Sequence, residues 1–152
     1  MKIITDLKYL RQKSEPIIAE ELVNVKLNGS EVDNIIKDLE DSLDLDRGIG
    51  LASIQIGIPK QVAIIRMPKL KLNLINPILL EKFDRFRFKA EKCLSLPGLA
   101  IDTSRYLDIV IKNGDGRTLS FTGLEAICVQ HELNHMAGKL IIDKGIKWRK
   151  RR

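Results

Sequence analysis

Two segments of the chain carry apolar residues at helical spacing. In the first, between Ser30 and Leu45, the apolar positions predict a helix that packs by one face, with Ser30 as a suitable N-cap. In the second, between residues 119 and 140, two histidines share the apolar stripe of a predicted helix, and Gly138 is a stop signal. The first stripe consists of Val32, Ile35, Ile36, Leu39 and Leu43, and the second of Leu124, Ile127, Cys128, His131 and His135.

Short β-type runs separated by turn residues fill the region between the two helices. They cover residues 62–66, 72–75 and 108–111, and the last run precedes a turn signal rich in Asn, Asp and Gly. These patterns predict antiparallel strands joined by hairpins. The chain has no internal repeat and no Ser/Gly linker, so we expect a single domain over 1–146 and a basic tail over 147–152.

The composition is that of a globular protein. The chain has 152 residues, of which 44% are hydrophobic and 30% charged. Its net charge is +6, but five positive charges lie in the tail, 147–152, so the rest of the chain carries +1. A basic tail can meet RNA, an anionic membrane or nothing at all. No apolar run has the length of a signal peptide or a membrane span, so we expect a cytoplasmic protein with no membrane or DNA partner.

His131, Glu132 and His135 form an HExxH motif in the second predicted helix. Residues four apart lie on one face of a helix, so two imidazoles can bind one metal ion while the adjacent carboxylate acts as a general base. The alternative is a helix turn with two incidental histidines. These are the only histidines in the chain, and burial rarely tolerates unpaired polar groups. The motif therefore favours a metal-dependent hydrolase.

A catalytic site of this kind needs a third protein ligand and one open position. Asp143 is the only carboxylate after the motif, so a metallopeptidase with Asp143 as the third ligand is one alternative. Cys128 shares the helix face but lies about 10 Å from His135 along the axis, which favours a packing or pocket role. Cys93 lies in a short segment bounded by Pro97-Gly98, where its thiolate could approach the helix. A buried apolar cysteine is the other interpretation of Cys93.

Three separated segments resemble the three signature motifs of the peptide deformylases in residues, order and separation. Weaker similarity extends outside them, so the resemblance covers nearly the whole chain, and three motifs together are far more specific than one HExxH. The resemblance implies an α+β fold in which antiparallel β-sheets surround a central HExxH helix. The segments are Gly48-Ile49-Gly50-Leu51-Ala52-Ser53-Ile54-Gln55, Glu91-Lys92-Cys93-Leu94-Ser95 and Gln130-His131-Glu132-Leu133-Asn134-His135.

The resemblance implies that Cys93, His131 and His135 bind the metal of a catalytic domain. In that family the metal is usually Fe²⁺, and Zn²⁺, Ni²⁺ or Co²⁺ can replace it. The implied reaction is hydrolysis of the N-formyl group from the N-terminal formylmethionine of nascent polypeptides, with release of formate. Thiolate and imidazole ligands suit both iron and zinc, so the preference for iron comes from the family and not from the spacing.

The resemblance also assigns the catalytic roles. Glu132 would be the general base, which takes a proton from water and delivers it to the leaving amine. The side-chain amide of Gln55 and the backbone N–H of Leu94 would stabilise the formyl oxygen as it becomes negative. Structural roles are the alternatives, because a buried Gln55 can be a hydrogen-bonded scaffold residue and Leu94 can simply pack.

Five further residues are candidates for substrate binding. Gly50 lacks a Cβ, so we expect it to border the active site where a peptide could add as an extended strand. Ile49, Leu124, Ile127 and Cys128 are candidates for an apolar pocket that accepts the methionine side chain. Core packing is the alternative for each of these four.

Glu91 precedes the cysteine segment and would be costly to bury unpaired, so we expect it to pair with Arg105 as part of the scaffold. Two positions depart from the family pattern, which commonly has Gly at Lys92 and Ala at Ser53. Neither position is a ligand or the general base, so we expect activity to survive.

The chain resembles the short deformylases, including those of bacteriophages, which lack a C-terminal helix that helps bacterial members to contact the ribosome. We hypothesise that the basic tail, 147–152, replaces part of that contact by attracting RNA phosphates. A tail that only improves solubility is the alternative. A non-enzymatic RNA-binding module with a degenerate site is a further alternative, which predicts that no metal binds.

Overall fold

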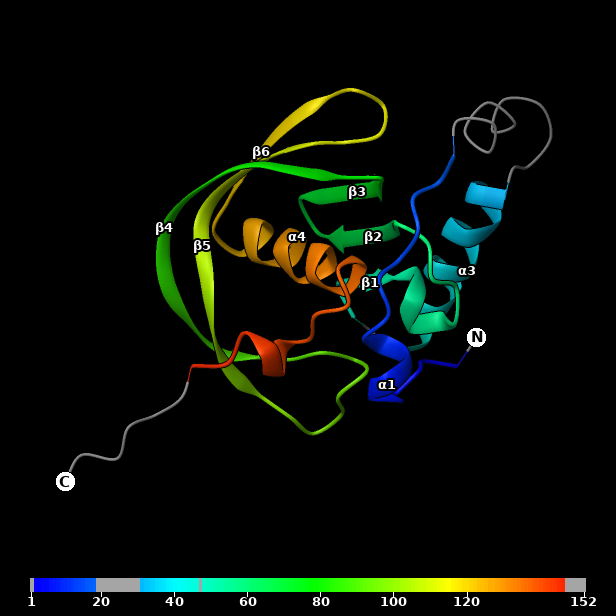
Figure 1. Ribbon diagram of the computed structural model, residues 1–152, viewed down its shortest axis with the longest axis horizontal. Helices are drawn as coiled ribbons and strands as arrows, with labels where there is room; N and C mark the ends of the chain where they lie inside the picture. The colour runs from blue at the N-terminus through cyan, green and yellow to red at the C-terminus, as the bar shows by residue number, and fades with distance from the viewer. Residues whose placement is uncertain (1, 19–30, 47, 147–152) are drawn as a thin grey trace.

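The computed structural model describes residues 2–18, 31–46 and 48–146. None of the helices in these ranges is both long and apolar enough to cross a membrane. Figure 1 shows the elements, which follow one another as α1 (Leu7–Leu10), α3 (Glu31–Asp46), β1 (Gly50–Ala52), η2 (Ser53–Ile56), β2 (Val62–Met67), β3 (Leu70–Ile75), β4 (Ile78–Glu91), β5 (Ile101–Lys112), β6 (Thr118–Thr122), α4 (Gly123–Met136) and η3 (Ile141–Asp143).

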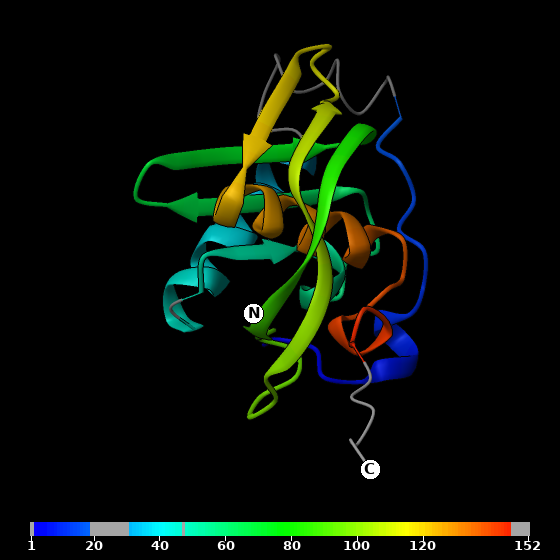
Figure 2. The ribbon, with the colours of Figure 1, turned by 90° about the vertical axis from the view of Figure 1, so that its left-hand side faces the viewer.

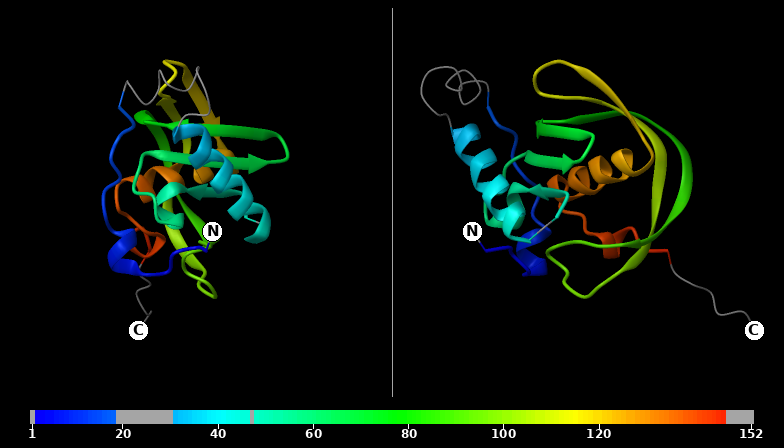
Figure 3. Two further views of the ribbon diagram at one scale, coloured as in Figure 1. Left: turned by 90° about the vertical axis from the view of Figure 1, so that its right-hand side faces the viewer. Right: turned by 180° about the vertical axis from the view of Figure 1, so that it is seen from behind.

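The strands form two antiparallel sheets that enclose a helix. One sheet has the order β1-β2-β3 and the other β4-β5-β6. The long strands β4 and β5 curve together along one side of the molecule, as Figure 2 shows. In Figures 1 and 3, α4 lies between the two sheets, and α3 lies on the far side of the first sheet. The predicted α+β fold, with antiparallel sheets around a central HExxH helix, is confirmed.

Helix α4 is covered from two sides, so most of its residues are buried. One core cluster joins Val129 of α4 to Ala63 of the first sheet and Ile109 of the second. A second cluster packs Leu39 of α3 against Ile64, on the other face of the first sheet. Side chains alternate between the faces of a strand, so the neighbours Ala63 and Ile64 serve different clusters. The first sheet is therefore covered on both faces.

The predicted helix and strands of the first half are confirmed with small changes at their ends. The helix predicted over 30–45 is α3, whose proposed cap, Ser30, lies outside the described residues. The predicted runs 62–66 and 72–75 belong to β2 and β3, and 108–111 belongs to the longer β5.

The second helix starts later than its sequence pattern suggests. Residues 118–122 form strand β6, which pairs with β5, and helical structure begins only at Gly123. The prediction that the helical pattern extends from residue 119 is wrong, because Leu119 and Phe121 alternate with polar residues and face the core at strand spacing. The predicted stop at Gly138 is confirmed by its φ of 74° just after α4.

Gly138 also has a packing role. A Cβ at this position would lie 2.4 Å from the backbone oxygen of Arg11. Position 138 thus requires glycine for two reasons: its backbone is left-handed, and another segment of the chain approaches it closely. The tight contact joins the end of α4 to the N-terminal segment, where the Ser14 N–H donates to the Met136 carbonyl oxygen at 2.9 Å.

Candidate metal centre and active site

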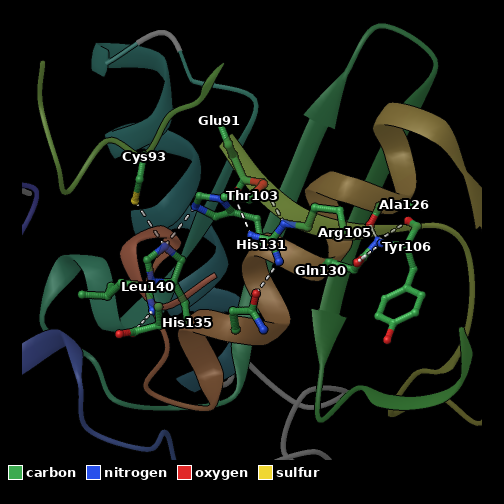
Figure 4. Close-up of polar contacts among 12 residues, drawn as sticks. Glu91, Cys93, Thr103, Arg105, Tyr106, Ala126, Gln130, His131, His135 and Leu140 are labelled. Carbon is green, nitrogen blue, oxygen red and sulfur yellow. Dashed lines mark hydrogen bonds and ion pairs between the residues drawn. The ribbon is translucent and has the colours of Figure 1, made fainter. Parts of the chain in front are cut away.

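Helix α4 presents His131 and His135 on one face, one turn apart. Their Nε2 atoms are 3.2 Å from each other. Cys93 comes from the segment after β4, and its Sγ atom is 3.4 Å from Nε2 of His135. Figure 4 shows the three side chains directed toward one another. Their potential ligand atoms all lie within 4.8 Å of one another, so residues distant in sequence form one compact cluster.

The cluster has the dimensions of a metal site. Tetrahedral coordination with usual bond lengths puts two imidazole nitrogens about 3.3 Å apart, and a sulfur and a nitrogen about 3.6 Å apart. The observed separations of 3.2 Å and 3.4 Å are close to both values. Three ligands of this type leave a fourth position for a reactant, as in catalytic sites. Cys93, His131 and His135 therefore fit a divalent ion in both chemistry and spacing.

The buried ion pair between Glu91 and Arg105 fixes the imidazole of His131 on the side away from the cluster. Glu91 Oε2 lies 2.8 Å from Nδ1 of His131, which leaves Nε2 directed at the cluster. Arg105 donates to both carboxylate oxygens of Glu91, at 2.7 Å and 2.6 Å. The predicted Glu91–Arg105 pair is thus confirmed. The sequence did not reveal its other members: Thr103 donates to Glu91 at 2.9 Å, and Arg105 donates to Asn134.

The network controls the charge of both histidines. Burial opposes protonation of His131, but hydrogen bonds with Cys93 and Glu91 outweigh it and raise the pKa of His131 to about 10. Burial, with the charges of His131 and Arg105, holds the pKa of His135 well below its usual range. The imidazole of His135 is therefore neutral at pH 7, the form that can bind a metal, and a metal bound at His131 would have to displace a proton.

Glu132 follows His131 on α4, and its carboxylate lies close to Gly50 of strand β1. Its side chain is buried, and its Oε2 atom has no hydrogen-bond partner among the described residues. A Cβ at Gly50 would lie 3.2 Å from Glu132 Oε1, so glycine gives this carboxylate room. Burial raises the pKa of Glu132 to about 7. A carboxylate with free lone pairs and a pKa near neutrality can both accept and donate a proton.

Gln55 approaches the cluster from η2, at the end of the first sheet. Its Oε1 atom accepts a hydrogen bond from the Ala52 N–H at 3.0 Å, which fixes the orientation of the amide. Its Nε2 atom donates to Ser95 Oγ at 3.1 Å and lies 3.7 Å from Cys93 Sγ. The amide donor is therefore directed at the segment that carries Cys93 and Leu94.

A cleft of about 810 Å³ opens onto these groups. Glu132, Gln55, Leu94, Cys93 and His131 line it, whereas His135 is buried behind them. All five predicted substrate residues line it too: Ile127 and Cys128 are buried, and Ile49 and Leu124 are about half exposed, at 45% and 50%. The sequence patterns missed Phe88, Leu96 and Leu99, which also line the cleft, because polar or irregular sequence surrounds each of them.

The other candidate ligands have different environments. Asp143 binds Arg11 at 2.9 Å, accepts from the Leu140 N–H at 2.8 Å, and is not part of the ligand cluster. Cys128 lines the cleft, and burial raises the pKa of its thiol to about 12, so it remains uncharged at neutral pH. Its described position agrees with a pocket wall rather than a thiolate ligand.

Comparison with known proteins identifies the family. Residues 4–151 match the family described as polypeptide deformylase. The chain belongs to the polypeptide deformylase family. It is 35% identical over 145 residues to the peptide deformylase of Aquifex aeolicus, a match that covers 89% of this chain and 85% of the relative. Members of this family are metal-dependent hydrolases that remove formyl groups, and this chain is one of them.

Solved structures of deformylases share the fold. The enzyme from Legionella pneumophila matches with a TM-score of 0.80 and 27% identity, over 95% of this chain and 84% of that one. The enzyme of a Vibrio parahaemolyticus bacteriophage, in complex with actinonin, matches with a TM-score of 0.77 and 30% identity, over 93% of this chain and 100% of that one. Family membership and the position of Asp143 together favour a deformylase over the alternative metallopeptidase.

Proposed function

We propose that this deformylase acts on the N-terminal formylmethionine of nascent polypeptides, with Cys93, His131 and His135 as the metal ligands. The observation that carries the proposal is the convergence of a thiol and two imidazoles beside a buried carboxylate, Glu132, in an apolar cleft. A cleft of about 810 Å³ with an apolar lining is large enough for a formylated N-terminal methionine. The proposed reaction yields formate and a free amino group.

We propose Fe²⁺ as the native metal, with Zn²⁺, Ni²⁺ or Co²⁺ as substitutes. Family membership supports iron, and the mixed sulfur and nitrogen ligand set is compatible with all four ions. When bound, the metal would act as a Lewis acid and lower the pKa of water, so that hydroxide would be available near neutral pH to attack a carbonyl carbon. Glu91, which is held by Arg105, contacts His131 Nδ1 and would orient this imidazole toward the metal.

Glu132 is the proposed general base and acid. It takes a proton from the water that attacks the formyl carbon, and it delivers that proton to the amine nitrogen as the C–N bond breaks. Its pKa of about 7 and its unpaired Oε2 atom support this role. The same proton is taken up and released in one cycle, so the carboxylate returns to its initial state.

Two donors are proposed to stabilise the oxygen that becomes negative. They are the side-chain amide of Gln55 and the backbone N–H of Leu94. The hydrogen bond from Ala52 to Gln55 holds the amide in one orientation before substrate binds. Donors preset in this way are each typically worth about 3 to 4 kcal/mol in the transition state.

The methionine side chain is proposed to occupy the apolar part of the cleft. Ile49, Leu124, Ile127 and Cys128 would contact it, and the peptide backbone would pass Gly50. The deformylase of the Vibrio bacteriophage was solved with actinonin, and we propose that actinonin binds the same cleft here. A rise in melting temperature of the metal-loaded enzyme on addition of actinonin would support this, and no rise at saturating concentration would contradict it.

The proposed setting is the cytoplasm, with transient contact to the ribosome through residues 147–152. The five positive charges of this tail support an electrostatic contact with ribosomal RNA. Ribosome binding should then weaken steeply with salt and after deletion of the tail. Binding that is indifferent to both changes would remove this proposal.

The experiment that tests the proposed activity is formate release from formyl-Met-Ala by enzyme prepared anaerobically with Fe²⁺. The parent enzyme should release formate, and a Glu132→Ala variant with the same metal content should be about 10²- to 10⁴-fold slower. A variant that retains full activity would contradict the role of Glu132. A metal-loaded parent that releases no formate would contradict the proposed substrate.

A further inference from the structure

The described lining of the active-site cleft includes one exposed charged side chain, that of Lys92. Among the described residues that line the cleft, the acidic and basic ones are Glu91, Lys92, His131 and Glu132. Glu91 and Glu132 are buried, and His131 is held within the ligand cluster. Lys92 is exposed, and it directly precedes Cys93 in the chain. Lys92 is therefore the exposed charge among the described residues of the cleft lining.

Nearby carboxylates do not neutralise this charge, because each has another partner. Glu91 pairs with Arg105 at 2.6 Å. Asp102, at the start of β5, pairs with Arg87 at 3.0 Å and also accepts from the Ala90 N–H at 3.0 Å. Within the described part of the chain, Lys92 has no carboxylate at ion-pair distance.

Lys92 is within reach of the peptide beyond the methionine. The formyl group reacts at the cluster that contains Cys93, and consecutive Cα atoms are about 3.8 Å apart. An extended peptide advances about 3.3 Å per residue, so the second and third residues lie roughly 7 to 10 Å from the formyl group. The flexible four-carbon stem of a lysine spans a comparable distance.

We infer that Lys92 gives this enzyme a preference for formylated peptides with an acidic side chain at the second or third position over those with a basic one. The inference rests on the proposed function. Two unit charges about 5 Å apart in water attract or repel enough for an acidic and a basic peptide to differ by about fifteenfold without salt, and by about three- to tenfold at physiological ionic strength. Salt reduces the difference, because the contact is exposed.

The contact is remote from the formyl carbon, so it contributes equally before and during the chemical step. The preference should therefore be found in KM and not in kcat. Lys92 also lies next to a proposed metal ligand, and its replacement can change the rate with every substrate. The ratio of kcat/KM for two substrates, measured on the same variant, removes that common effect.

The test compares formyl-Met-Ala-Asp-amide with formyl-Met-Ala-Lys-amide on the iron-loaded enzyme. The parent should show a three- to tenfold higher kcat/KM for the Asp peptide. Lys92→Gln should bring the ratio to about one, and Lys92→Glu should invert it. Lys89→Gln is the matched control, since Lys89 is exposed on β4 but does not line the cleft, and this variant should keep the parent's ratio.

Binding provides a second measurement that does not require turnover. In a Glu132→Gln background, the dissociation constants of the two peptides should differ by the same factor, and Lys92→Gln should abolish that difference. A parent ratio near one, or a preference that persists in Lys92→Gln, would overturn the inference. Formate release from neither peptide would instead contradict the proposed function itself.

Discussion

Replacement of Glu91 by Gln tests the buried network behind the metal ligands. The side chains of Glu91 and Arg105 are only 5% and 2% exposed. Burial alone would raise the pKa of Glu91, but hydrogen bonds from Arg105 and His131 outweigh it and lower the pKa from 4.5 to about 2. That difference corresponds to roughly 3 kcal/mol of folding free energy at neutral pH. Loss of one partner from a buried ion pair typically costs about 3 to 5 kcal/mol, which agrees.

We expect Glu91→Gln to lower the free energy of unfolding at pH 7 by about 3 kcal/mol and the melting temperature by roughly 6 to 12 °C. The free energy of unfolding is measured by urea denaturation of the metal-free protein. Asp115→Asn is the matched control, because the Arg117–Asp115 pair is 65% and 46% exposed. The control should cost no more than about 1 kcal/mol.

The pH dependence gives the sign of the effect. The folded pKa of Glu91 is depressed, so its contribution is complete above 4.5 and is lost as the pH falls from 4.5 to about 2. The stability difference between parent and Glu91→Gln should shrink over that range. A variant within 1 kcal/mol of the parent at pH 7, or a difference independent of pH between 3 and 7, would refute the reasoning. Metal affinity should also fall by about 10- to 100-fold, since His131 loses the carboxylate that contacts its Nδ1 atom.

Other predictions concern single side chains. Gln55→Ala should lower kcat for formate release by about 10²- to 10³-fold at unchanged metal content. A smaller loss would show that the amide of Gln55 is structural and does not stabilise the transition state. Gly138→Ala should lower thermal stability by more than Gly98→Ala, because both positions have positive φ but only Gly138 meets another backbone segment, at Arg11. Equal losses would show that packing at Gly138 is unimportant. Cys128→Ala should retain the metal, measured by elemental analysis, because the thiol of Cys128 stays protonated with a pKa of about 12.

Local patterns were sufficient to predict the helix that carries the motif. His131 and His135 lie one turn apart on any helix, so their shared face follows from sequence spacing alone. That Glu91 pairs with a cation was also predictable, because a buried carboxylate needs one, but this argument did not single out Arg105. The third contact of Glu91, to His131, depends on how β4 meets α4 in space and has no sequence signal.

Strand β4 shows where the sequence patterns fail. Its residues from Ile78 to Lys89 mix apolar, acidic and basic side chains without strict alternation, and most of them are exposed. Strand periodicity arises when one face is buried and the other solvated, so an exposed edge strand leaves little pattern. The position of Cys93 follows from where β4 ends. The sequence therefore predicted Cys93 as a ligand only through its resemblance to a family.

The central claim is that Cys93, His131 and His135 hold one metal ion, and a crystal structure of the iron-loaded enzyme with anomalous diffraction at the iron edge tests it most directly. The account predicts a single peak about 2.3 Å from Cys93 Sγ and about 2.0 to 2.1 Å from both Nε2 atoms, with full occupancy. A peak elsewhere, such as at Asp143, or an iron coordinated without the Cys93 sulfur would contradict it.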